Sequence, residues 1–155
     1  MKRFAKSTCA ALALAVSSIA FAADTPADVL EWRYVPGISK PIEMAVVSGD
    51  PAADGPYVVR YRMPSGMKMN PQRFSDERQL TVIKGIFWIS GGESFNWKDM
   101  DEFKQGAVIL KEANKPYFGW ARTAVILEER GTGPSRFEYV HEEDDPRNRR
   151  ARIDN

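Results

Sequence analysis

Short apolar runs separated by turn residues recur along the chain. In YVVRYRM, residues 57–63, the odd positions are apolar and the even ones include Arg60 and Arg62. This alternation has the period of a β-strand with one face in the core and one in solvent. Comparable runs, most of them followed by turn residues, occupy residues 31–35, 42–47, 79–90, 106–110, 123–129 and 136–140. The pattern predicts an all-β fold, an antiparallel sandwich or barrel, with a short turn at residues 97–105.

The first 22 residues have the layout of a secretory signal peptide. Lys2, Arg3 and Lys6 precede an apolar run over residues 10–20, and a small-x-small pattern ends at Ala22. The apolar run is too short to span a bilayer. We therefore expect cleavage after Ala22 and a periplasmic or secreted protein.

Removal of this segment changes the charge and the cysteine content. It takes 22 of the 155 residues, the single cysteine, Cys9, and three basic residues, so that the formal charge falls from +1 to −2. The remaining length suits one domain, residues 23–140, followed by a charged, solvated C-terminal tail, residues 141–155. A near-neutral exported domain predicts neither nucleic-acid binding nor membrane association.

Two segments space glycines and polar residues in a regular way. In GMKMNPQRFSDERQLTVIKG, residues 66–85, five residues lie between Gly66 and Gln72, then one before Phe74, three before Arg78 and six before Gly85. The second segment begins twenty residues later and contains Gly106, Glu112, Asn114, Tyr117 and Ala121.

These intervals resemble the two motifs of the cupin family. The phrases WRYVPG, SGDPAADGPYVVRYRMPSG, ERQLTVIKGIFWIS, FGWA and GTGPSRFEYV also resemble small exported RmlC-like cupins of unassigned function, over nearly all of the mature chain. The resemblance implies a single-domain double-stranded β-helix, a jelly-roll barrel of six to eight strands. Its mouth normally holds a metal bound by three histidines and a glutamate.

All four metal-ligand positions that the resemblance implies are substituted in this chain. The histidine positions fall on Gln72, Phe74 and Tyr117, and the glutamate position falls on Arg78. A phenyl ring offers no lone pair and a guanidinium repels a cation. The only histidine is His141, in the expected tail. We therefore expect no metal and no cofactor.

The register of the first motif leaves one alternative open. A bulge would turn Glu77 inward in place of Arg78. The site would then offer one carboxylate, one amide and one phenol, a weak set for a transition metal.

The substituted positions predict a ligand site. If Gln72, Arg78 and Tyr117 point inward beside Phe74, the barrel mouth offers an amide, a planar cation and a phenol. Such a set suits a small anionic molecule, because a guanidinium can bind two oxygens at once. The wall of the pocket is expected to include Met67, Met69, Trp88 and Trp120.

Two alternatives stay open beside ligand binding. One is a metal-independent, isomerase-like or epimerase-like cupin enzyme with Tyr117 as acid or base; the sequence favours binding over catalysis, because no histidine partner is available. The other is a barrel filled by its own side chains that serves as a structural or homodimerising module. Its interface would be the aromatic segment GIFWISGGESFNW, residues 85–97.

Overall fold

The computed structural model describes residues 29–35 and 37–151, with side chains to residue 148. The predicted signal peptide, its cleavage site and Cys9 lie outside these residues. No helix in the described ranges is long and apolar enough to cross a membrane.

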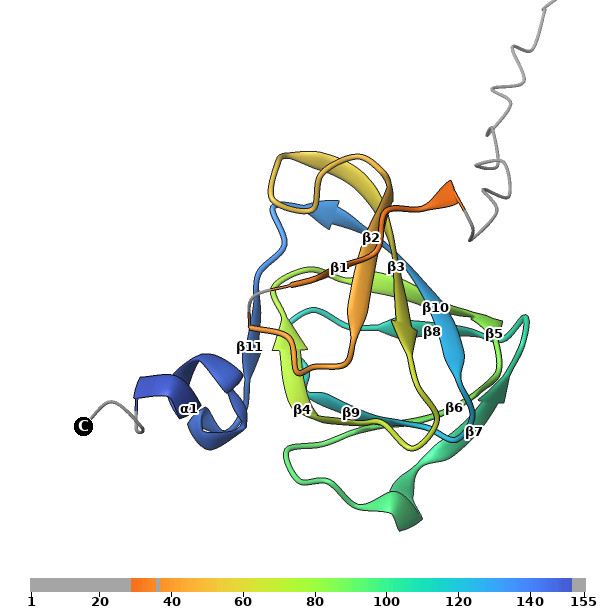
Figure 1. Ribbon diagram of the computed structural model, residues 1–155, viewed down its shortest axis with the longest axis vertical. Coiled ribbons are helices and arrows are strands. Elements are labelled where there is room, and N and C mark those ends of the chain that lie inside the picture. The colour runs from red at the N-terminus through yellow and green to blue at the C-terminus, as the bar shows by residue number, and fades with distance from the viewer. Residues whose placement is uncertain (1–28, 36, 152–155) are drawn as a thin grey trace, which may run out of the picture.

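The described chain forms two antiparallel sheets that face each other, which confirms the all-β prediction (Figure 1). The six-stranded sheet has the order β1-β2-β3-β10-β5-β8 and the five-stranded sheet the order β11-β4-β9-β6-β7. The strands are β1 Arg33–Tyr34, β2 Glu43–Ser48, β3 Gly55–Met63, β4 Lys68–Phe74, β5 Arg78–Lys84, β6 Ile86–Gly91, β7 Asp101–Lys104, β8 Val108–Lys111, β9 Tyr117–Ala121, β10 Val125–Gly133 and β11 Phe137–Tyr139. Three short helices are η2 Trp97–Asp99, η3 Glu142–Asp144 and α1 Pro146–Ala151.

The apolar run predicted over residues 79–90 is divided into two strands that belong to different sheets. The break falls at Gly85, whose φ is +87°. A Cβ at this position would lie 2.4 Å from the carbonyl oxygen of Ala124. A glycine is therefore needed both for the backbone conformation and for the close approach of the neighbouring loop.

The core lies between the sheets and receives side chains from both. Phe87 and Ala121 come from the five-stranded sheet, and Val82 and Leu127 from the six-stranded one; all four are at most 2% exposed. Phe87 packs so closely on β9 that a Cβ at Gly119 would lie 2.5 Å from its ring.

One charged residue of β3 is buried where solvent was predicted. Arg60 is only 4% exposed. Its Nε donates to Glu128 Oε2 at 2.8 Å. The alternation correctly predicted the two faces of β3. The prediction that Arg60 is exposed to solvent was wrong, because its ion pair with Glu128 allows the charged side chain to be buried.

The start of the expected solvated tail packs against the domain. β11 pairs with β4 and leads into η3 and α1 beside the sheets (Figure 1). Asn70 Nδ2 donates to Asp144 Oδ1 at 2.6 Å, and His141 Nε2 lies 2.7 Å from the carbonyl oxygen of Glu93. These contacts hold residues 141–144 against the sheet and the β6–β7 loop.

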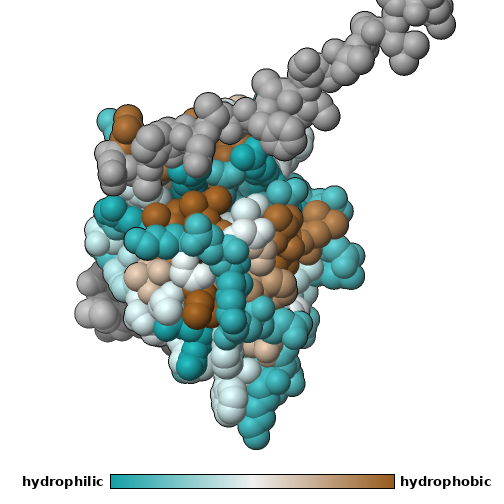
Figure 2. Space-filling view, turned by 90° about the vertical axis from the view of Figure 1, so that its right-hand side faces the viewer, coloured by the Kyte–Doolittle hydropathy of each residue, from teal (hydrophilic) through white to brown (hydrophobic). Residues whose placement is uncertain are grey.

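The side of the molecule opposite this C-terminal segment has a mixed surface. Figure 2 shows hydrophobic residues there in separate patches divided by hydrophilic ones.

Candidate ligand-binding site

The four residues predicted to form the site come from three neighbouring elements. Gln72 and Phe74 lie on β4, Arg78 begins β5 and Tyr117 begins β9. Gln72 and Tyr117 are direct partners between strands, and the Arg78 guanidinium lies 3.5 Å from the centre of the Phe74 ring. Arg78 is 3% exposed whereas Glu77 is exposed, so Arg78 takes the inward position.

The donors of Arg78 are directed at protein groups. Nη1 donates to Glu129 Oε2 at 2.9 Å, and Nη2 donates to Asp76 Oδ1 and Ser135 Oγ, both at 2.5 Å. The remaining donor, Nε, is buried without a hydrogen-bond partner. Both ends of the guanidinium fork are thus occupied by carboxylates of the chain, and the fork is not open to a ligand.

Lys111, at the end of β8, adds a second buried cation to this cluster. Its Nζ lies 3.0 Å from Glu129 Oε1 and 4.5 Å from the centre of the Phe74 ring. Burial, the largest effect, lowers the pKa of the Lys111 ammonium, and Glu129 opposes this shift. Burial would raise the pKa of the Glu129 carboxyl, but Lys111 and Arg78 outweigh burial and hold that pKa below its usual value.

The cluster balances its own charge. Two cations, Arg78 and Lys111, face two carboxylates, Glu129 and Asp76. Among the residues that the structure describes, no three His, Cys, Asp or Glu side chains gather in a way that could hold a metal ion. A divalent metal of the kind the resemblance implies does not fit here, because the Glu129 carboxylate is already paired with two cations and the neighbouring Phe74 and Gln72 offer a phenyl ring and an amide.

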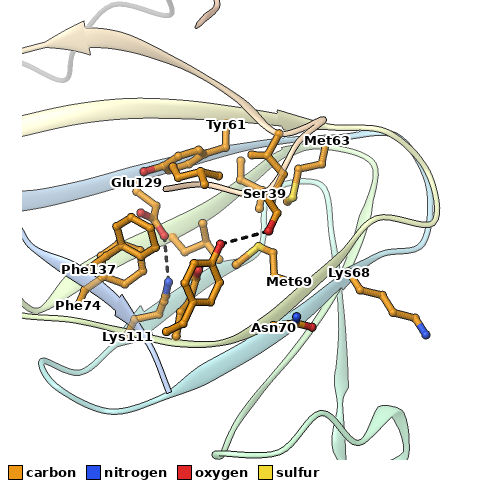
Figure 3. A pocket seen from close by; sticks show the side chains of 16 residues that line it. Ser39, Tyr61, Met63, Lys68, Met69, Asn70, Phe74, Lys111, Glu129 and Phe137 are labelled. Atoms are coloured by element: carbon orange, nitrogen blue, oxygen red, sulfur yellow. Dashed lines mark hydrogen bonds and ion pairs between the residues drawn. The ribbon is translucent and has the colours of Figure 1, made fainter. Parts of the chain in front are cut away.

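A cavity of about 40 Å³ lies beside this cluster, between the two sheets. It has room for roughly one to three water molecules. Figure 3 shows Tyr61 and Met63 on one side of it, with Met69 and Lys111 on the other. Its lining comprises Ile38, Ser39, Ile42, Tyr61, Met63, Lys68, Met69, Asn70, Gln72, Phe74, Leu80, Lys111, Leu127, Glu129, Phe137 and Tyr139.

Two polar groups of the lining have no partner. Neither the Tyr61 hydroxyl nor the Gln72 amide makes a hydrogen bond to any residue in the described ranges. Burial, the main cause, raises the pKa of Tyr61 well above its usual value. Tyr61 therefore remains a neutral hydroxyl that can donate a hydrogen bond.

A loop and a strand close the mouth of the cavity. Ile38, Ser39 and Ile42 come from the segment before β2, and Phe137 and Tyr139 come from β11. The Ser39 Oγ and the Tyr139 hydroxyl lie 3.3 Å apart and form a hydrogen bond. This hydrogen bond links the two segments across the cavity.

The sequence located part of this lining and missed the rest. Gln72, Phe74 and Met69 line the cavity as expected, whereas Arg78 lies behind Phe74. The Tyr117 hydroxyl accepts a hydrogen bond from the Glu112 backbone N–H at 3.1 Å and does not face the cavity. Tyr61, Lys111 and Glu129 were missed, although the inward parity of Leu127 predicts the same orientation for Glu129.

Comparison with solved structures identifies the fold. An RmlC-like cupin from Shewanella frigidimarina NCIMB 400 matches with a TM-score of 0.56 and 10% identity, over 70% of this chain and 87% of the other. KdgF from Halomonas sp. matches with a TM-score of 0.55 and 13% identity, over 70% of this chain and 93% of the other. Salicylate 1,2-dioxygenase from Pseudaminobacter salicylatoxidans matches with a TM-score of 0.55 and 11% identity, over 67% of this chain and 32% of the other.

The chain therefore has the cupin fold, as the two sequence motifs predicted. At these identities the likeness extends to the fold alone. No known family and no curated protein matches the sequence.

Proposed function

We propose that the cavity between the sheets binds a small polar organic molecule with a carboxylate or carbonyl oxygen, and that the protein does so without a metal. The observation that carries this proposal is a pair of groups in the cavity lining that make no hydrogen bond within the described residues, the Tyr61 hydroxyl and the Gln72 amide. An oxygen-bearing ligand can accept hydrogen bonds from both groups, which make none within the described residues.

Lys111 favours an anionic ligand at this site. Its Nζ keeps donor capacity beyond the bond to Glu129, since an ammonium carries three N–H groups. Arg78 contributes indirectly in this proposal, because it shares the negative charge of Glu129 and leaves Lys111 less fully neutralised. The role first expected of Arg78, direct contact with the anion, passes to Lys111.

The size of the cavity restricts the ligand. Molecules as small as acetate or propionate require only a small separation of the Ser39 and Tyr139 segments, whereas an aromatic acid requires both segments to move. One of the fold neighbours is a salicylate dioxygenase. Salicylate is therefore a suitable large probe, and acetate a suitable small one.

The test compares probe binding to the wild-type chain and to Tyr61→Phe, using backbone amide shifts during titration with acetate, propionate, propionamide and salicylate. We expect propionate to bind more tightly than propionamide and Tyr61→Phe to weaken binding by about fivefold, the effect of one lost hydrogen bond. Tyr34→Phe, which removes a hydroxyl from an exposed tyrosine, is the matched control. The proposal fails if none of the four probes shifts the amides of the cavity lining, or if both variants bind equally well.

Three further parts of the proposal need their own measurements. Elemental analysis of protein purified without a polyhistidine tag should find no stoichiometric metal. The mass of the exported protein should correspond to a chain that starts at Ala23. Sedimentation at rising concentration tests the alternative of a homodimerising module, which predicts a concentration-dependent dimer.

A further inference from the structure

The outer face of the five-stranded sheet carries a row of aromatic and charged side chains. Lys68 on β4, Trp120 on β9, Trp88 on β6 and Glu102 on β7 are successive partners across four neighbouring strands. The tryptophans were expected in the wall of the cavity. They point to the opposite face, because their strand neighbours Phe87, Ile89 and Ala121 are buried in the core.

The two indoles form a platform on which a guanidinium is stacked. The Trp88 and Trp120 ring centres lie 6.0 Å apart in an edge-to-face arrangement. The guanidinium carbon of Arg122 lies 4.0 Å from the Trp120 ring centre and 4.5 Å from that of Trp88. Lys68 Nζ approaches the Trp120 ring to 5.1 Å, and Figure 3 shows the Lys68 side chain directed away from the cavity.

Neither cation of this row, Arg122 or Lys68, forms an ion pair with any residue that the structure describes. The one carboxylate in the row, Glu102, accepts from Trp88 Nε1 at 3.1 Å and pairs with Lys104 at 3.1 Å. Arg122 interacts with this acid at longer range: it contributes, after Lys104 and Trp88, to the lowered pKa of the Glu102 carboxyl. The row thus has an excess of positive charge. Its two cations, Lys68 and Arg122, are exposed, and their contacts with the indole rings set their positions.

Stacking on the two indoles orients the Arg122 guanidinium so that it can bind an anion. A guanidinium held against aromatic rings keeps its N–H donors at the edge of the plane, where they match two oxygens of a carboxylate or sulfate. Because Lys68 and Arg122 both contact Trp120, an anionic group above that ring can reach both cations.

We propose that this row, Lys68, Trp88, Glu102, Trp120 and Arg122, is a binding surface for an anionic polysaccharide. The row is elongated and crosses a sheet face, which suits an extended chain. Saccharide rings present apolar C–H groups to indoles and hydroxyl groups to Glu102, and their acidic substituents match Lys68 and Arg122. This surface shares only Lys68 with the lining of the cavity between the sheets, and that side chain is directed away from the cavity, so the inference does not depend on the ligand proposed there.

The experiment measures retardation of the purified chain by polygalacturonate in native affinity gels, with uncharged dextran as the matched neutral polymer. We expect polygalacturonate to retard the wild-type protein and dextran to have no effect. Arg122→Gln should weaken the interaction by about tenfold, the scale of one charge-assisted contact. Arg122→Lys should restore only part of the loss, since it keeps the charge and loses the stacked fork.

Arg136→Gln provides the matched control, because Arg136 is likewise exposed and forms no ion pair within the described ranges. Its affinity should equal that of the wild type. Equal losses in the two glutamine variants, or equal retardation by dextran, would overturn the proposal. The proposal would also be overturned if polygalacturonate did not bind the protein but vesicles with anionic lipid did, and if that binding depended on Arg122.

Discussion

Lys111 and Glu129 form an ion pair 3.0 Å long in the interior, with side chains that are only 2% and 5% exposed. The second carboxylate oxygen of Glu129 accepts from Arg78 at 2.9 Å. One buried carboxylate therefore holds two cations near the positions where the cupin resemblance implies a metal.

Glu129→Gln should destabilise the protein more than Lys111→Met. Loss of the carboxylate leaves two buried cations short of a partner and should cost about 3–5 kcal/mol in the free energy of unfolding. Lys111→Met leaves Glu129 paired with Arg78 and should cost roughly 1–3 kcal/mol. Urea denaturation measures both values. Glu138→Gln, at the exposed pair with Arg73, should change stability by less than about 1 kcal/mol, and a similarly small change for Glu129→Gln would contradict a structural role of the buried pair.

Stability in acid should depend on Glu129. The pKa of this carboxyl is held below the ordinary value of 4.5 in the folded state. Its contribution is therefore complete above that value and is lost as the pH falls toward the folded-state pKa. The stability difference between wild type and Glu129→Gln should shrink as the pH is lowered from about 6 to about 3. A difference that stays constant over this range would show that the carboxylate charge is not what stabilises the fold.

Gly85→Ala should destabilise the protein more than Gly106→Ala. Both glycines have a positive φ, +87° and +88°, so both substitutions carry the same backbone penalty of about 1 kcal/mol. A Cβ at Gly106 meets nothing within 4 Å, whereas one at Gly85 lies 2.4 Å from the Ala124 oxygen. Thermal unfolding of the two variants separates the steric cost from the backbone cost. Equal melting temperatures would mean that the loop before β10 can move away from the added methyl group without a loss of stability.

Truncation after Val140 should lower the melting temperature. It removes the hydrogen bonds of Asp144 and His141 to Asn70 and to the Glu93 carbonyl. Asp144→Ala in the full chain isolates one of these bonds and should cost roughly 1 kcal/mol. A truncated chain as stable as the full one would restore the interpretation of residues 141–155 as a solvated tail.

The alternation of apolar and polar residues was sufficient to predict the β-rich fold and most of its strands. It missed β4, because KMNPQRF is polar and contains Pro71, and strand formation there depends on its pairing with β9 and β11. The prediction of a short turn at residues 97–105 was also wrong in part, because Asp101–Lys104 form β7, which pairs with β6. The alternation also did not predict that the Tyr117 hydroxyl accepts a hydrogen bond from the backbone of Glu112, in the loop between β8 and β9, while the next residue, Phe118, is buried.

The candidate site could be only partly predicted because its members meet through pairing between distant strands. Spacing within one motif located Gln72 and Phe74 at the cavity. Lys111 lies within the second motif but not at one of its ligand positions, and Glu129 ends an apolar run outside both motifs. They meet because β5 pairs with β8 on one edge and with β10 on the other.

By itself, the sequence determined the strand periodicity, the glycine positions and the residue types at positions 72, 74, 78 and 117, because these are local properties of residue type and spacing. Only the tertiary structure decided that Arg78 faces inward yet is occupied by Glu129 and Asp76, and that Trp88 and Trp120 face outward. The physical reason is that the role of a charged or aromatic side chain depends on the residues that surround it. Strand register brings those residues together from distant parts of the chain, as for Arg78 and Glu129, which are 51 residues apart in sequence.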